Sequence, residues 1–195
     1  MAGGKAPTHI VLEEGEWVSW YENGNEKDRG NYKSGKMEGA WAGWYPNGVH
    51  NYEGQWLNDL KVGEWSYWWP TALPNEFGAY DKEGRKHGEW TTHNQAGVIE
   101  MKGEYYEGEP DGKWEYFYPN GSPQRSQSYK DGRLDGKALT YNRSGKLIQE
   151  VHYEAGKKHG KYIRYNEKTG EIDEHYIYEH GRVADVKVSK NPGQK

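Results

Sequence analysis

A frame of glycine and aromatic residues recurs along most of the chain. It consists of a glycine, any residue, an aromatic, two residues and one or two further aromatics, followed by a turn that ends in glycine. The seven copies open at Gly15, Gly39, Gly63, Gly88, Gly112, Gly136 and Gly160. The steps between them are 24 residues, apart from one step of 25. A fixed period of this length is typical of repeat proteins, in which each unit contacts only its neighbours.

The residues inside each unit predict strands joined by tight turns. Counted from the opening glycine as zero, position two is aromatic in six units and Ala138 in the other, and position seventeen is aromatic in all seven, allowing one insertion in the last. Aromatic residues favour strands, and no window has the spacing of an amphipathic helix. Asn23-Gly24 and Asn47-Gly48 predict two-residue hairpins with a type I′ turn. The predicted fold is all-β: an elongated, single-layer antiparallel β-meander built from seven hairpin repeats of about 24 residues.

The hairpin loops also predict the register of the strands. If the loop occupies positions eight and nine, position two pairs with position fifteen of the same unit. Position fifteen is glycine in the first four units, so a facing Trp can lay its ring across the bare backbone. Position seventeen then falls beside position two of the next unit, which places Tyr32 next to Trp41. Positions two, fifteen and seventeen therefore share one face, and position five points to the other.

The frame divides the chain into three parts. Residues 1–14 are a lead-in, in which residues 9–12 could form a first, capping strand; residues 15–183 are the repeat array; and residues 184–195 are predicted to be a disordered tail. Unit three has residues 70–74 in place of a Pro-Asn-Gly tip, so we expect a tip of different shape there. Unit seven widens its tip to residues 166–170.

The composition is compatible with a folded chain and excludes some partners. Hydrophobic residues make up 33% and the mean hydropathy is −1.25, values that would suggest disorder if 15% of the residues were not aromatic. Residues 1–135 contain 14 Lys and Arg against 22 Asp and Glu, and residues 136–195 contain 12 against 8. Neither part is the strongly basic surface that a nucleic acid requires. The chain has no cysteine, which excludes disulfides and thiolate-ligated metals.

The sequence lacks the usual signs of export and of catalysis. Its beginning has no apolar run typical of a signal peptide, so we expect a cytoplasmic protein. It contains no HExxH, GxSxG or phosphate-binding GxGxxG motif. His87 and His159 precede opening glycines and are expected in solvated turns. Clustered carboxylates such as Glu104 and Glu107 lack the cleft that an acid–base pair needs in a single-layer sheet. We therefore predict a non-enzymatic protein with no cofactor and no metal site.

Several segments resemble a known repeat family. GEWVSWYENG, GAWAGWYPNG and GKWEYFYPNG, with the closing YKSGKMEG, YKDGRLDG and YEAGKKHG, look like MORN-type repeats. They are most similar to the bacterial variant found in the YwqK-type antitoxin family, over about residues 15–181. The resemblance implies an elongated meander with two strands per unit. It also implies an antitoxin or immunity role, in which the protein binds a toxin and blocks it sterically.

The aromatic residues at and next to position five are the predicted partner-binding site. Trp and Tyr are frequent hot-spot residues of protein interfaces, and an exposed apolar patch usually marks a contact surface. The predicted site comprises Trp20, Trp44, Trp68, Tyr21, Tyr45, Trp69 and Phe117. The expected partner is a protein, and a toxin or effector with a basic surface would suit the acidic first part of the chain.

Two other kinds of ligand remain open at this stage. Aromatic platforms also stack on sugars and quaternary amines, as in short Trp-rich cell-wall-binding repeats, although the 24-residue period and the missing export signal argue against a glycan. A membrane lipid would require clustered basic residues, for which Lys157, Lys158, Lys161 and Arg164 come nearest. The end strands of such a sheet have free edges, which allow either a monomer or an edge-paired dimer.

Overall fold

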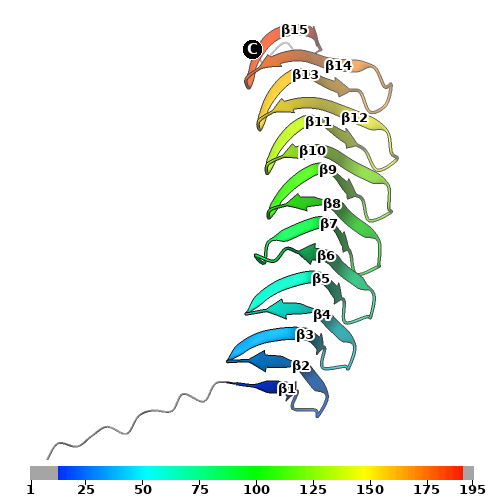
Figure 1. Ribbon diagram of the computed structural model, residues 1–195. Helices are drawn as coiled ribbons and strands as arrows, with labels where there is room; N and C mark the ends of the chain where they lie inside the picture. Colours follow the sequence, from blue (N-terminus) through cyan, green and yellow to red (C-terminus); the bar gives the residue numbers. More distant parts are fainter. Residues whose placement is uncertain (1–12, 191–195) are drawn as a thin grey trace, which may run out of the picture.

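The computed structural model describes residues 13–190 as one open sheet of fifteen antiparallel strands. Each strand pairs with the strands that precede and follow it in the sequence, so that the sheet is a stack of bent hairpins in chain order (Figure 1). The strands are β1 (Gly15–Trp20), β2 (Glu26–Lys33), β3 (Lys36–Trp44), β4 (His50–Leu57), β5 (Leu60–Trp68), β6 (Pro74–Tyr80), β7 (Lys86–His93), β8 (Ile99–Tyr106), β9 (Glu109–Phe117), β10 (Pro123–Lys130), β11 (Arg133–Tyr141), β12 (Leu147–Glu154), β13 (Lys157–Tyr165), β14 (Ile172–Glu179) and β15 (Arg182–Ser189). The predicted all-β meander is confirmed. Across these residues, no helix is long and apolar enough to cross a membrane.

The predicted pairing of positions two and fifteen is confirmed, but the ring that covers each glycine comes from a different strand than expected. Trp41 pairs with Gly54 in the same unit, yet its ring lies against Gly30 of the preceding unit, where an added Cβ would overlap the indole. The cause is a bulge in β3. Arg29 pairs with Ala42 and Asn31 with Glu38, so three residues of β3 oppose Gly30. The bulge bends the strand and carries the Trp ring over the neighbouring backbone.

The opening glycine makes this bulge possible. Gly39 has a φ of +74°, a left-handed conformation that side chains other than glycine adopt only at a cost. The six other opening glycines also have a positive φ. Glycine recurs at position zero because of this backbone conformation. Space for a side chain is not the reason, because nothing lies within 4 Å of a Cβ built on Gly39.

The tryptophans at position two form the core of this single-layer sheet. Trp41, Trp65, Trp90 and Trp114 are only 1–3% exposed. Each indole N–H is also paired: the Nε1 of Trp41 donates to the backbone oxygen of Asn31 at 3.2 Å, and the Nε1 of Trp90 to that of Ala79 at 3.1 Å. The Tyr32 ring lies edge-on to Trp41 at a centroid distance of 5.3 Å, as predicted. The rings at position two are therefore buried with their N–H groups satisfied, whereas Nε1 of Trp56 at position seventeen is buried without a hydrogen-bond partner.

The prediction of type I′ turns at the Asn-Gly tips is wrong. At the first tip only Gly24 has a positive φ. Its N–H donates to the Tyr21 oxygen at 3.0 Å, and the Tyr21 N–H to the Asn25 oxygen at 2.8 Å. This is a three-residue loop, a type I turn followed by a left-handed glycine. The Asn23 side chain adds two contacts to this tip: Oδ1 accepts from Asn25 N, and Nδ2 donates to the Pro46 oxygen of the next unit at 2.8 Å.

The type I′ conformation occurs instead in the second turn of most units. Ser34 and Gly35 both have a positive φ, and so do Asp131 and Gly132. These turns are also joined to each other, because the Gly132 N–H donates to the backbone oxygen of Pro110 at 3.0 Å. Both edges of the stack are therefore linked from unit to unit by hydrogen bonds.

The irregular units differ from expectation in part. The tip of unit three has the same hydrogen bonds as the others, with Ala72 in the left-handed place of glycine, so the expected difference in shape is wrong. The wider tip of unit seven is confirmed, because the Gly170 N–H donates to the Asn166 oxygen four residues earlier. The predicted first strand at residues 9–12 lies outside the described residues.

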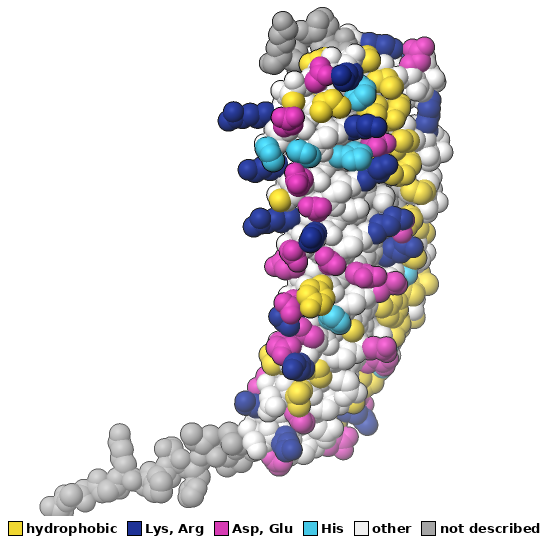
Figure 2. Space-filling view, turned by 45° about the horizontal axis from the view of Figure 1, so that its top comes forward, with side chains coloured by type: hydrophobic (Ala, Val, Ile, Leu, Met, Phe, Trp, Pro, Cys, Tyr) yellow, Lys and Arg dark blue, Asp and Glu magenta, His cyan; other side chains and the backbone are white. Residues whose placement is uncertain are grey.

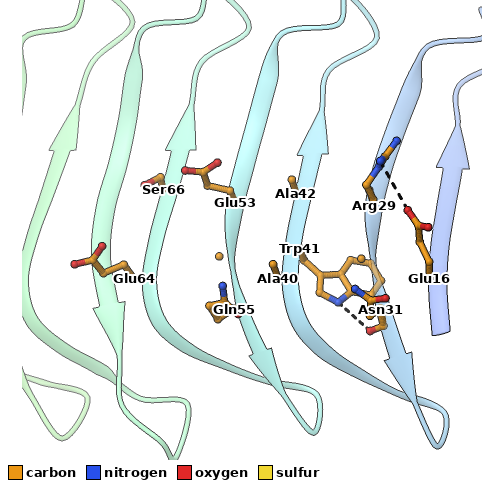
Figure 3. A pocket seen from close by; sticks show the side chains of 12 residues that line it. Glu16, Arg29, Asn31, Ala40, Trp41, Ala42, Glu53, Gln55, Glu64 and Ser66 are labelled. Carbon is orange, nitrogen blue, oxygen red and sulfur yellow. Dashed lines mark hydrogen bonds and ion pairs between the residues drawn. The ribbon is translucent and has the colours of Figure 1, made fainter. Parts of the chain in front are cut away.

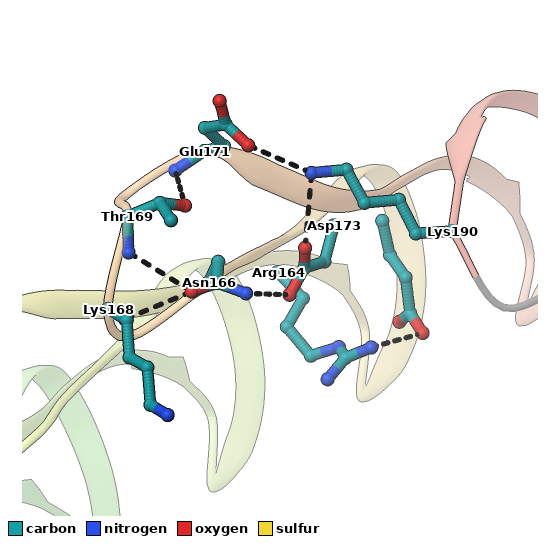
Figure 4. Close-up of polar contacts among 8 residues, drawn as sticks. Arg164, Asn166, Lys168, Thr169, Glu171, Asp173 and Lys190 are labelled. Atoms are coloured by element: carbon teal, nitrogen blue, oxygen red, sulfur yellow. Dashed lines mark hydrogen bonds and ion pairs between the residues drawn. The ribbon is translucent and has the colours of Figure 1, made fainter.

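The C-terminal end of the array extends further than predicted. The proposed tail began at residue 184, but β15 continues the sheet over Arg182–Ser189 and pairs with β14. Ion pairs hold this region together (Figure 4): Lys190 Nζ lies 3.1 Å from a Glu171 oxygen, and Arg164 donates to the buried Glu174 at 2.7 Å. Strand β15 lacks aromatics, so the repeat pattern could not reveal it. The rest of the predicted tail, from residue 191, is not described.

Candidate partner-binding face

The two faces of the sheet differ in what they carry. The ladder face holds positions two, fifteen and seventeen, with the buried tryptophans. The strip face holds positions one, three, five, fourteen and sixteen, which alternate with the ladder residues along each strand. Position one is exposed in all seven units: Glu16, Ala40, Glu64, Glu89, Lys113, Lys137 and Lys161. The strip face therefore carries, at position one of every unit, a side chain that the fold leaves exposed.

A continuous row of rings crosses the strip face from β3 to β7, and we call it the aromatic row. Its members are Trp44, His50, Trp68, Phe77 and His93, with successive ring centroids 5.2, 5.1, 6.2 and 5.8 Å apart. All are half-buried. The sequence prediction included the two tryptophans but not the other three members. His50 and Phe77 lie on the returning strands at positions that are not aromatic in other units, and His93 is the histidine that unit four has at position five.

The remaining predicted position-five residues flank this row. Trp20 in β1 is 62% exposed, the most open of the large apolar side chains on the described strands. Phe117 in β9 lies under the ammonium group of Lys102, whose Nζ is 5.9 Å from the ring centroid. An aromatic side chain that is exposed in the free protein has the most surface area to bury when a partner docks.

The predicted residues at position six are used within the chain. The Tyr21 hydroxyl donates to the Trp44 backbone oxygen at 2.8 Å, and the Tyr45 hydroxyl to the Trp68 oxygen at the same distance. Trp69 Nε1 donates to the His93 oxygen at 3.1 Å. Each of these side chains bridges the tips of consecutive units. Their donor groups are therefore used within the chain, where they bind the backbone of three residues of the aromatic row.

An open, acid-lined hollow of about 690 Å³ lies on the strip face over β1 to β5 (Figure 3). Its charged lining residues are Glu16, Glu53, Glu64 and Arg29. Arg29 donates to Glu26 at 2.7 Å and holds the pKa of that carboxyl below its usual value. Ala42 and Ser66 line the hollow two residues before Trp44 and Trp68, which makes the hollow adjacent to the aromatic row. The two features together form one surface that is acidic and aromatic.

The charge of the strip face changes sign along the array. Position one is acidic or neutral from Glu16 to Glu89 and basic from Lys113 to Lys161. Figure 2 shows acidic side chains crowded about the middle of the stack and long basic side chains projecting from its C-terminal part. The basic residues are partly neutralised, because Lys113 lies 2.6 Å from Glu115 and Lys137 lies 3.4 Å from Glu150. In the acidic part, Arg29 lies 3.8 Å from Glu16, while Glu64 and Glu89 have no ion pair among the described residues.

The ladder face carries lysines that are already engaged by rings. Lys61 Nζ is 4.2 Å from the Trp65 ring centroid and donates to the Tyr67 hydroxyl at 2.6 Å. Burial lowers the pKa of Lys61 and raises that of Tyr67 well above its usual range. Lys86 lies 3.7 Å from the Trp90 ring centroid and pairs with Glu76. These lysines stabilise the ladder by cation–π contact. They are therefore less available to a ligand than the exposed charged side chains of the strip face.

The comparison with protein families agrees with the repeat frame. Three segments match the MORN repeat variant. They are residues 13–36, 110–131 and 134–155, and each match begins two residues before an opening glycine. Repeats of this variant indicate a repeat-based binding module. The comparison with curated proteins finds no match.

Proposed function

We propose that this chain is a non-enzymatic module that binds a protein partner through the strip face of its first units, and that the partner is a toxin which it neutralises. The observation that carries the proposal is the acidic and aromatic surface formed by Trp20, the aromatic row and the hollow. Aromatic anchors supply most of the binding energy in protein interfaces, and acidic neighbours attract a basic partner.

The shape of the sheet supports a steric mechanism. Its single layer presents side chains from consecutive strands on one continuous surface, held at fixed spacing by the buried tryptophan ladder. Such a surface can cover the active cleft of a partner without changing its own conformation. The antitoxin role itself rests on the resemblance to the YwqK-type repeats and on the charge of this surface.

Binding is tested first by capturing candidate partners on the purified full chain. Each captured protein is then expressed in cells with and without this chain, and growth is measured. The proposal expects one partner that arrests growth alone and is relieved by the wild-type chain. Recovery of glycan or lipid alone, or partners that are harmless when expressed, would contradict it.

The contact surface is tested by Trp20→Ala and Trp44→Ala. Each change should raise the Kd for the partner at least about tenfold, because truncating a hot-spot aromatic costs about 2 kcal/mol or more of binding free energy. The melting temperature should change little for Trp20→Ala, since its side chain is 62% exposed. Tyr141→Ala is the matched control, because it removes a position-five ring from unit six, outside the aromatic row. Equal binding by all three variants would place the interface elsewhere.

A further inference from the structure

Three side chains with metal-binding atoms converge at the second turns of the last two units. Glu154 ends β12, His159 lies in β13, and His180 lies in the turn between β14 and β15. One ligand atom from each residue lies within 4.8 Å of the other two. The His159 and His180 ring centroids are 5.2 Å apart. Glu154 and His159 flank one turn and His180 lies in the corresponding turn of the next unit, which explains why their spacing in the sequence gives no metal-binding motif.

One nitrogen at the centre of this group is not satisfied by a hydrogen bond. His159 Nδ1 is shielded from solvent and has no hydrogen-bond partner. A Glu154 carboxylate oxygen lies 3.4 Å from it, but the two do not form a hydrogen bond. A cation placed between them would accept electron pairs from both atoms. The nearby Lys158 does not fill this place, since its Nζ lies 4.7 Å from the Tyr162 ring centroid on the ladder face.

The other units show that this arrangement departs from the standard contact. The residue before an opening glycine is usually Asp or Glu. Its carboxylate accepts a hydrogen bond from the first backbone N–H in the second turn of the unit that this glycine opens. Glu38 accepts from Asn58 N at 3.1 Å, and Asp135 accepts from Ala155 N at 3.0 Å. In unit six this carboxylate is replaced by His159, and the turn residue that it would accept from is His180. Both ends of the standard contact are thus replaced by imidazoles, with Glu154 beside them.

The equivalent place between units three and four provides a comparison. It also has a histidine, His87, with Asp81 and Glu107 at the corresponding positions. There Arg85 lies 2.8 Å from Asp81 and 3.8 Å from Glu107, so a cationic side chain already neutralises both carboxylates. The group at Glu154, His159 and His180 has no arginine in this role among the ion pairs of the described residues.

We propose that Glu154, His159 and His180 bind one divalent transition-metal ion, with Zn²⁺ the best match. Two imidazoles and a carboxylate form a typical Zn²⁺ donor set, with ligand distances of about 2.0–2.2 Å, and leave a further coordination position open. Glu154 and His180 are exposed, and small rotations of their side chains toward the half-buried His159 bring the ligand atoms, now within 4.8 Å of each other, to such distances. The ion would join the second turns of units six and seven and hold the C-terminal end of the array together.

The test uses full-length chain without a histidine tag, freed of metal by chelation and titrated with ZnCl₂ by calorimetry. The expected result is one ion per chain and a rise in the melting temperature, because an ion that binds only the folded state stabilises it. Titration with CoCl₂ should give visible absorption bands stronger than those of the hydrated ion. No heat and no bands with up to millimolar metal would overturn the proposal.

Two variants locate the site without disturbing the turns. His180→Asn copies Asn58, which has the same left-handed conformation in the second turn of unit two, and Glu154→Lys copies Lys130 of unit five. Each should weaken Zn²⁺ binding at least about tenfold and abolish the cobalt bands. His87→Ala is the control and should bind as the wild type does. Wild-type binding by His180→Asn and Glu154→Lys would show that the metal is held elsewhere and would overturn the proposal.

Discussion

At the scale of single residues, Ala72 is the clearest case of a conformation imposed by the array. It occupies the place that glycine holds at the other tips and has a φ of +64°. Its N–H donates to the Trp69 oxygen at 2.9 Å, as Gly48 donates to Tyr45. The hydrogen bonds of the tip and the stacking against neighbouring units therefore hold an L-residue in the left-handed region.

Ala72→Gly is expected to raise the free energy of unfolding. Relief of the left-handed strain contributes about 1–2 kcal/mol, and the greater entropy of glycine in the unfolded chain removes about 0.4–1 kcal/mol of it, leaving a gain of about 0.5–1 kcal/mol. Urea unfolding measures the change. Ala79→Gly in the extended strand β6 is the control and should lower stability by a similar amount. A loss of stability in Ala72→Gly would show that the tip is not strained.

The sequence predicts which residues are aromatic neighbours more readily than which residues are free to bind. Trp20 could be identified as exposed because its face follows from strand alternation. Tyr21, Tyr45 and Trp69 could not be separated from it, since their use depends on a hydrogen bond to the backbone of the next unit. His50 and Phe77 were missed because they join the row only through the packing of neighbouring strands.

At the scale of strands, glycine at position fifteen is coupled to tryptophan at position two of the next unit. Gly78 lies under Trp90, and Gly103 lies under Trp114. Where position two changes to Ala138, position fifteen of the preceding unit is Gln127. A tryptophan ring that lies on the backbone of position fifteen leaves no volume for a Cβ there. The small side chain of Ala138 leaves that volume free for Gln127. The pair of Gln127 in unit five and Ala138 in unit six therefore replaces the Gly–Trp pair of the other units without leaving a gap in the ladder.

Gly78→Ala should lower the free energy of unfolding by about 1–3 kcal/mol, because the added methyl group forces the Trp90 ring to move. Trp90→Ala should cost about 3–5 kcal/mol. The double variant should lose less than the sum of the two, since the methyl group meets no ring once the indole is gone. Gln127→Ala beside Ala138 should cost no more than about 1 kcal/mol. Additive losses in a urea-unfolding cycle would contradict the direct contact.

The register of the strands was predictable, but their bending was not. Pairing of position two with position fifteen follows from the loop position and alternation alone. The bulge depends on the positive φ of the opening glycine, and a glycine in a sequence is equally compatible with an extended strand. Likewise, an Asn-Gly pair allows both hairpin types, and the tips at Ala96-Gly97 and Ser144-Gly145 adopt the same three-residue loop without an Asn before the glycine.

At the scale of the whole molecule, each unit is an interchangeable segment. Deletion of residues 39–62 joins Glu38 to Gly63 and should bring Trp65 onto Gly30, in the place that Trp41 occupies. The shortened chain is therefore expected to fold, with a melting temperature a few degrees lower because one neighbour interface is lost. Circular dichroism and thermal unfolding measure both. Deletion of residues 51–62 removes half a unit and reverses the strand direction, so it should not fold. Equal behaviour of the two deletions would contradict the repeat frame.

The chain order of the sheet has a consequence for how the protein folds. Most β-proteins fold slowly because they must bring together strands that are far apart in the sequence, and the entropy of closing long loops delays them. Here every pairing joins consecutive strands across a short turn. The mean sequence separation of contacts is therefore low for a β-protein, and folding can begin at any hairpin and spread in both directions. Each hairpin can join the sheet as it leaves the ribosome, before the rest of the chain has been made.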